Sequence, residues 1–155
     1  MQPRMKSPAL VLPTVMEAAH ALTKATEAAG VPRKLAELLS LRASQINGCA
    51  VCLDMHSRAL VKLGETAERI ACVAAWRETP YFTDAERAAL ALTEAITRVP
   101  DRADPVSDEI WNEAARHYDE KVLAGLVLSI GLINLWNRLN ITTRQITGPW
   151  IEQYV

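Results

Sequence analysis

The fold is decided by residues 32–64, which read PRKLAELLSLRASQINGCAVCLDMHSRALVKLG. The first half opens on a proline, which a helix tolerates in its first turn, and repeats apolar residues at helical spacing. These apolar residues are Leu35, Leu38, Leu39 and Ile46. Asn47-Gly48 ends that pattern, and a second helix is predicted from Cys49 to Leu63, where Gly64 stops it. The stretch therefore predicts two consecutive helices joined by a very short turn.

Helix signals continue through the rest of the chain. Helical patterns cover about residues 12–29, 65–77, 83–98 and 121–139, and a further helix begins after Ser107. Thr83-Asp84-Ala85-Glu86 has the pattern of a capping box. No stretch shows the alternation and hairpin turns typical of strands. We therefore predict an all-α fold, a bundle of about six to seven helices that forms one domain over residues 1–155.

Composition restricts the classes of function. The chain has 155 residues and a formal net charge of -1, which gives no electrostatic reason to expect binding to nucleic acid or to an anionic membrane. The basic N-terminus is followed by a short apolar run that Pro13 interrupts, which is unlike a signal peptide. The longest apolar stretch, Leu123 to Trp136, is shorter than a membrane span. We expect a cytoplasmic protein, in which a cysteine pair serves redox or metal chemistry.

Two cysteines and a histidine share one face of the second helix. Positions i, i+3, i+4 and i+7 from Cys49 are Cys49, Cys52, Leu53 and His56. Two thiols three residues apart can close a disulfide, and the start of a helix favours the thiolate. Burial on an apolar face opposes the charged form, so a reactive thiol here needs a nearby proton acceptor, for which His56 is the candidate.

Other interpretations of these residues remain open. The pair could be inert and buried, or it could bind a metal, which would need four ligands. Cys72, His20 and His117 do not have ligand spacing, so we expect no metal and no bound cofactor. Cys72 is predicted to pack as a small apolar residue, and the two histidines to lie at the surface or at helix ends. Trp76 and Trp136 could line a pocket over the thiols, but large aromatic residues at helical spacing more often lie in the core or at an interface.

One residue of the preceding helix makes the cysteine pattern more specific. Glu37 precedes Cys49 by twelve positions, and a short turn at Asn47-Gly48 would fold its helix back against the cysteine helix. The carboxylate could then reach His56 or a water beside it. Such a contact would orient the imidazole and raise its basicity, as in a catalytic triad.

The pattern Glu37-x11-Cys49-x2-Cys52-x3-His56 resembles that of the AhpD-like alkylhydroperoxidases of the carboxymuconolactone decarboxylase family. The segments 41–49, 75–79 and 134–139 also resemble segments of this family, and together they place the core at about residues 15–145.

The resemblance implies an all-helical fold and a thiol peroxidase activity toward alkyl hydroperoxides, and so an antioxidant role. Cys52 would attack the peroxide and become a sulfenic acid, and Cys49 would resolve it as a disulfide. His56 and Glu37 would form the proton relay. An external dithiol, which in AhpD is a lipoyl-bearing protein, would then reduce the disulfide.

The chain departs from AhpD in two respects. Val51 stands where AhpD has a second histidine, and the chain holds a single copy of the core, like the short family members that assemble into trimers or hexamers. The nearly all-round apolar helix at 121–139 also favours a closed homo-oligomer.

Two other functions are compatible with these residues. One is a redox sensor or disulfide-exchange protein with little peroxidase turnover. The other is a decarboxylase or isomerase that acts through Glu37 and His56 alone.

Overall fold

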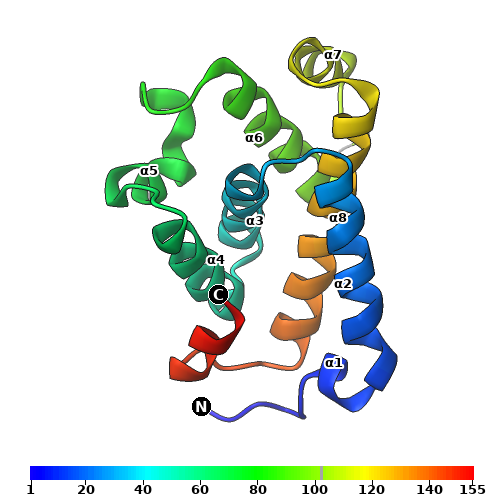
Figure 1. The fold of residues 1–155 in the computed structure, drawn as a ribbon, viewed down its shortest axis with the longest axis vertical. Helices are drawn as coiled ribbons and strands as arrows, with labels where there is room; N and C mark the ends of the chain where they lie inside the picture. Colours follow the sequence, from blue (N-terminus) through cyan, green and yellow to red (C-terminus); the bar gives the residue numbers. More distant parts are fainter. Residues whose placement is uncertain (102) are drawn as a thin grey trace.

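The structure is a computed structural model that describes residues 1–101 and 103–155, and every regular element in these ranges is helical (Figure 1). The elements are α1 (Pro8–Val11), α2 (Pro13–Ala28), α3 (Arg33–Asn47), α4 (Ala50–Lys62), α5 (Ala67–Cys72), η1 (Val73–Glu78), α6 (Asp84–Thr97), η2 (Val99–Asp101), α7 (Asp108–His117), α8 (Glu120–Thr142) and η3 (Pro149–Tyr154), where η denotes a 3-10 helix. The all-α prediction is confirmed. The described part of the chain holds more segments than the six to seven predicted, because short helices form at both ends (α1 and η3) and within the chain (η1 and η2).

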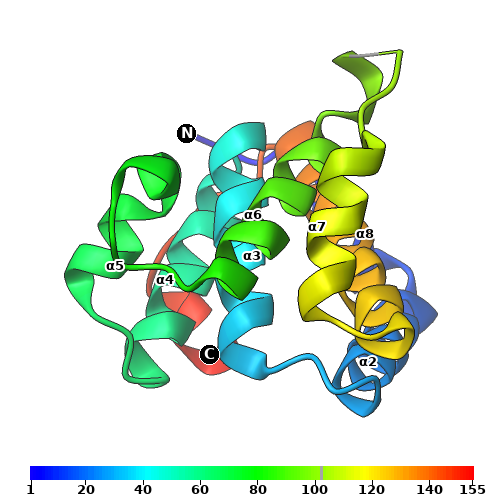
Figure 2. The same ribbon diagram turned by 90° about the horizontal axis from the view of Figure 1, so that it is seen from above.

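Helix α3 lies at the centre of the bundle. It packs against α4, α6 and α8, and Figure 2 shows it surrounded by these helices. Its side chains Leu38, Leu39 and Leu41 are at most 2% exposed and meet Leu90 of α6 and Leu126 of α8 in the main core. Burying a leucine side chain contributes about 1.5–3 kcal/mol, so these contacts hold α3 firmly as the base for the cysteine helix.

A glycine allows the longest helix to approach its neighbour. A Cβ atom at Gly125 of α8 would lie 2.7 Å from Val31 Cγ2 and 2.8 Å from Ala29 Cβ. Both atoms belong to the connection that follows α2, so α8 can lie close alongside α2 only because this position has no side chain (Figure 1).

The turn between α3 and α4 forms as the sequence predicts. Gly48 caps α3 in the left-handed conformation, with φ 74° and ψ 34°, which is strained for other residues. The chain then turns into α4, whose first helical residue is Ala50, so Cys49 is the N-cap of the helix and not its first residue. Helices α3 and α4 consequently pack against each other.

Two predictions about helix boundaries need correction. The helix predicted over about 65–77 is α5 followed by the 3-10 helix η1, which contains a non-helical residue at Ala75. No element was predicted after residue 139, whereas α8 continues to Thr142 and η3 follows. Figure 1 shows η3, in red, against α4.

Helix α8 is longer than the apolar stretch 123–136 that lies within it. Its 23 residues are long and apolar enough to cross a membrane by length and composition alone. A core helix passes the same test, and α8 packs against α2, α3 and α6. Val127, Leu135 and Ile141 nevertheless remain 38–44% exposed. A homo-oligomer that covers them stays a prediction.

Candidate active site

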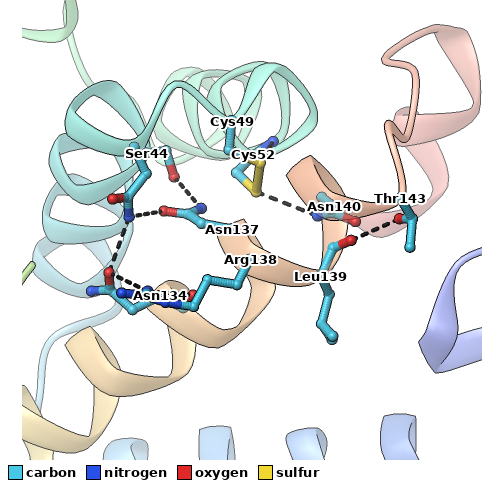
Figure 3. Close-up of a disulfide and its surroundings, with 10 residues drawn as sticks. Ser44, Cys49, Cys52, Asn134, Asn137, Arg138, Leu139, Asn140 and Thr143 are labelled. Carbon is cyan, nitrogen blue, oxygen red and sulfur yellow. Dashed lines mark hydrogen bonds between the residues drawn. A yellow bond between two sulfur atoms is a disulfide. The ribbon is translucent and has the colours of Figure 1, made fainter. Parts of the chain in front are cut away.

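Cys49 and Cys52 form a disulfide at the start of α4 (Figure 3). Their Cα atoms are 5.4 Å apart, a usual separation for a disulfide. Both residues are buried, 1% and 3% exposed, in a small apolar cluster with Ala43, Val51 and Ile133. The predicted redox pair is therefore assembled, and the two sulfur atoms face different surroundings.

The sulfur atom of Cys49 caps the helix. As N-cap residue, Cys49 accepts a hydrogen bond on Sγ from the backbone N–H of Cys52, at 3.4 Å. A free N–H group at a helix start stabilises negative charge. Cys49 is thus the sulfur that the helix start stabilises.

The sulfur atom of Cys52 is approached by α8 instead. Asn140 Nδ2 donates to Cys52 Sγ at 3.4 Å, from a residue 88 positions along the chain (Figure 3). Cys52 also lines the large cavity described below, whereas Cys49 does not. A molecule in the cavity therefore lies beside Cys52 and not beside Cys49.

Three asparagines fix the cysteine turn to α8. Asn47, at the end of α3, donates to Asn134 Oδ1 at 3.0 Å and to Asn137 Oδ1 at 2.8 Å. Asn137 in turn donates to Ser44 Oγ at 3.0 Å, and Asn134 donates to Thr97 Oγ1 at 3.2 Å. Buried amides must be hydrogen-bonded, and these partners come from three helices. The network therefore fixes the position of the cysteine turn relative to α8.

The predicted contact between Glu37 and His56 is present. Glu37 Oε2 lies 2.6 Å from His56 Nδ1, with the two side chains 18% and 16% exposed. A carboxylate on Nδ1 fixes the orientation of the ring and leaves Nε2 to exchange protons. Helix α3 supplies the acid and α4 the imidazole, so the packing of these two helices creates the pair.

A cavity of 530 Å³ opens beside Cys52 and His56. Its volume lies within the range of sites that bind organic molecules, about 300–1,000 Å³. Most of its wall is apolar, formed by side chains of α1, α2, α4, α8 and η3. These include Met16, Ala19, Met55, Ile133, Trp136, Trp150 and Tyr154.

The C-terminal segment supplies one wall of this cavity and is anchored to α4. Ile151 is fully buried in the cysteine cluster. Glu152 forms ion pairs with Arg58 at 2.8 Å and with Lys62 at 3.4 Å, and these partners lower the pKa of Glu152. Exposed ion pairs are screened by solvent and contribute little to stability, so the burial of Ile151 is the stronger anchor.

The other residues singled out by sequence are dispersed. Trp76 is buried in the main core, away from the cavity, whereas Trp136 lines the cavity. His20, predicted at the surface, is exposed but also lines the cavity, and His117 is exposed beside Glu113. Cys72 is a free, half-buried cysteine at the end of α5. Within residues 1–101 and 103–155, no group of three or more His, Cys, Asp and Glu side chains could hold a metal ion.

Sequence reasoning missed Asn140 and the whole of the C-terminal wall. A signal for Asn140 was present, because Asn134, Asn137 and Asn140 recur every third residue in a largely apolar helix. Amides repeated in such a helix need partners, which indicates a polar contact surface. No local sequence pattern predicts the C-terminal wall of the cavity, because this wall depends on contacts with α4 about 90 residues earlier.

Solved structures of other proteins are similar to the structure of this chain. A solved structure from Agrobacterium tumefaciens, of a protein of unknown function suggested to be the antioxidant defence protein AhpD, matches with a TM-score of 0.86. It is 30% identical, and the match covers 95% of this chain and 99% of that one. The debrominase Bmp8 shares the fold at a TM-score of 0.77 and 22% identity, over 91% of this chain and 75% of Bmp8.

Two curated bacterial proteins are similar in sequence, and both are uncharacterized. YdfG of Bacillus subtilis (strain 168) is 41% identical over 131 residues, which cover 84% of this chain and 88% of YdfG. YnjA of Escherichia coli (strain K12) is 35% identical over 103 residues, which cover 66% of this chain and 55% of YnjA. The family model for carboxymuconolactone decarboxylases matches residues 13–95, which include Glu37, both cysteines of the disulfide and His56. The chain belongs to the carboxymuconolactone decarboxylase family.

Proposed function

We propose that the protein is a thiol-dependent peroxidase that reduces organic hydroperoxides with Cys52. One observation carries the proposal: of the two paired cysteines, only Cys52 lines the cavity, and His56 lines the same cavity while it is held by Glu37. The cavity can bring a hydroperoxide to a sulfur atom that has a base on its own helix and a second thiol beside it.

The reaction balances with these groups. His56 accepts the proton of the reduced Cys52, and the thiolate attacks one oxygen of the peroxide. The O–O bond breaks, the sulfur is oxidised to a sulfenic acid, and the alkoxide takes the proton back and leaves as an alcohol. The Cys49 thiol then attacks the sulfenic sulfur, which releases water and forms the disulfide.

An external dithiol completes the cycle. Its thiolate attacks one sulfur of the disulfide, and its second thiol resolves the mixed disulfide. Two electrons and two protons thereby return to Cys49 and Cys52. The reductant is a reaction partner, and no bound cofactor is needed.

The size of the cavity supports an organic substrate over hydrogen peroxide. Hydrogen peroxide has two heavy atoms and would leave most of the 530 Å³ without contacts. A hydroperoxide with a bulky apolar body fills the space beside Trp136 and Met55, and its burial adds about 25 cal/mol per Å² of apolar surface. This binding energy is available only to the organic substrate.

The experiment is stopped-flow oxidation of the reduced protein by cumene hydroperoxide and by hydrogen peroxide, in wild type and in Ala19→Phe. Ala19 is 5% exposed and lines the cavity, so a phenyl ring there takes up substrate space. We expect the rate with cumene hydroperoxide to fall about tenfold and the rate with hydrogen peroxide to stay nearly constant. Ala18→Phe, on the exposed face of the same helix, is the matched control.

Two results would refute the proposal. If neither peroxide oxidises the thiols faster than a partner disulfide does, the protein is a disulfide-exchange protein. If a Cys49→Ser/Cys52→Ser double variant remains active on a lactone acid, the site is a decarboxylase that acts through Glu37 and His56.

A further inference from the structure

The two sulfur atoms of the pair are stabilised by different donors. The start of α4 stabilises the Cys49 sulfur atom, because the backbone N–H group of Cys52 donates a hydrogen bond to it. That N–H group is thereby occupied by the Cys49 sulfur atom. The Cys52 sulfur has its hydrogen bond from the side chain of Asn140, which belongs to another helix.

The surroundings of Cys52 make such a donor necessary. The sulfur atom lies in an apolar cluster with Val51 and Ile133, against which Met55 and Trp136 pack. Burial in apolar surroundings disfavours a thiolate, whereas a hydrogen bond donated to the charged form favours it. A thiolate at Cys52 therefore depends on each polar group that reaches it.

Asn140 differs from the other asparagines of α8. The side chains of Asn134 and Asn137 are engaged with oxygen partners from neighbouring helices and are at most 8% exposed. The Asn140 side chain is half-buried, lines the cavity and has one hydrogen bond among the described residues, the one to Cys52 Sγ. The first two hold the helices together, and the third presents its amide to the reacting atom (Figure 3).

We propose that Asn140 is a further catalytic residue, whose side-chain amide donates to the Cys52 sulfur and stabilises the thiolate in the apolar cavity. Its effect on turnover rests on the proposed function, because it requires Cys52 to be the sulfur that attacks the substrate. Its effect on the thiolate does not require any peroxide. The two statements can therefore be tested separately.

The test measures the pH at which the Cys52 thiol becomes reactive. In a Cys49→Ser/Cys72→Ser background, Cys52 is the only cysteine left, and a serine at position 49 still caps the helix. The rate of alkylation by iodoacetamide is followed against pH in this background, with Asn140 and with Asn140→Leu. Leucine keeps the size of the side chain and removes the donor.

We expect the pH midpoint of alkylation to rise by about one unit in Asn140→Leu, a tenfold loss of thiolate below the midpoint. Asn140→Asp replaces the donor with a negative charge and should raise the midpoint further. Gln145→Leu is the matched control, because this amide lines the same cavity but donates to Met5 and Thr143. Its alkylation midpoint should equal that of the background.

An unchanged midpoint in Asn140→Leu overturns the proposal, and so does an equal rise in Gln145→Leu. If the leucine variant does not fold, Asn140→Asp decides, because it preserves the shape of the side chain, and an unchanged midpoint there overturns the proposal. A shifted midpoint in a protein that does not reduce hydroperoxides would leave the role of Asn140 intact and refute the proposed function. Full peroxidase rates in Asn140→Leu would leave the proposed function intact and refute the role of Asn140 in catalysis.

Discussion

Two carboxylates that contact residues of neighbouring helices, the buried Glu94 and the half-buried Glu37, have very different partners. Glu94 of α6 is bound by Arg42 at 2.7 Å, by Arg77 at 2.8 Å and by the indole N–H of Trp76 at 3.0 Å. Glu37 is bound at 2.6 Å by His56, and its other charged neighbour, Arg33, is 4.0 Å away and largely exposed.

The difference shows how one residue type serves structure in one place and chemistry in another. Burial alone raises the pKa of Glu94, but hydrogen bonds from Arg77, Trp76 and Arg42 outweigh it and hold the pKa below its usual value. Guanidinium groups do not release protons near neutral pH, so Glu94 is a fixed charge. The partner of Glu37 can gain and lose a proton, and it faces a cavity.

The largest expected effect is a loss of stability when Glu94 is replaced. Glu94→Ala leaves Arg42, whose side chain is 11% exposed, and the Trp76 N–H without their partner. We expect the free energy of unfolding to fall by about 3–5 kcal/mol in urea titrations. Glu113→Ala, which removes an exposed pair with Arg116, should change it by less than about 1 kcal/mol. Equal losses in both variants would show that the Glu94 cluster is not a structural anchor.

The second effect is a loss of activity when Glu37 is replaced. Glu37→Gln keeps the shape of the side chain and removes the charge that orients His56, so the rate of thiol oxidation by cumene hydroperoxide should fall about 100-fold. The free energy of unfolding should change by no more than about 1 kcal/mol. Arg33→Ala is the control for general charge effects near Glu37 and should keep the rate within about twofold. A full rate in Glu37→Gln would remove this residue from the relay.

The smallest effect is a dependence of stability on pH. Because the pKa of Glu94 is lower in the folded protein than in the unfolded chain, the unfolded chain binds more protons as pH falls. The stability that Glu94 contributes is complete above the pKa of an unfolded glutamate, near 4.5, and is lost as pH falls toward the folded value. Between pH 5 and pH 3, urea titrations should show a shallower decline in Glu94→Gln than in wild type. Parallel declines would contradict the assignment.

The sequence predicted the region around the cysteines well because its signals are local. Pro32, Gly48 and Gly64 set the limits of two helices, and the helical spacing placed Cys52 and His56 on one face. The contact between Glu37 and His56 then required only that a short turn pack the helices together, which the structure shows. The buried cluster around Glu94 was not predicted, because no motif distinguished this residue from other helical glutamates.

The parts that sequence did not predict depend on long-range contacts. The cavity wall at Trp150 and Tyr154 exists because η3 packs back onto α4, through Ile151 and the pair of Arg58 with Glu152. The non-helical residue Ala75 directly precedes Trp76, whose indole lies in the core and donates to Glu94. Neither arrangement has a local pattern that a single sequence reveals.

The central claim is that Cys52 attacks the substrate and Cys49 resolves the product, and trapping of the sulfenic acid tests it most directly. In a Cys72→Ser background, Cys49→Ser protein is treated with one equivalent of cumene hydroperoxide in the presence of dimedone, and the labelled residue is identified by mass spectrometry. The account predicts one dimedone adduct, on Cys52, and no peroxide consumption in the matched Cys52→Ser protein. An adduct on Cys49 in the Cys52→Ser protein, with peroxide consumed at the wild-type rate, would contradict it.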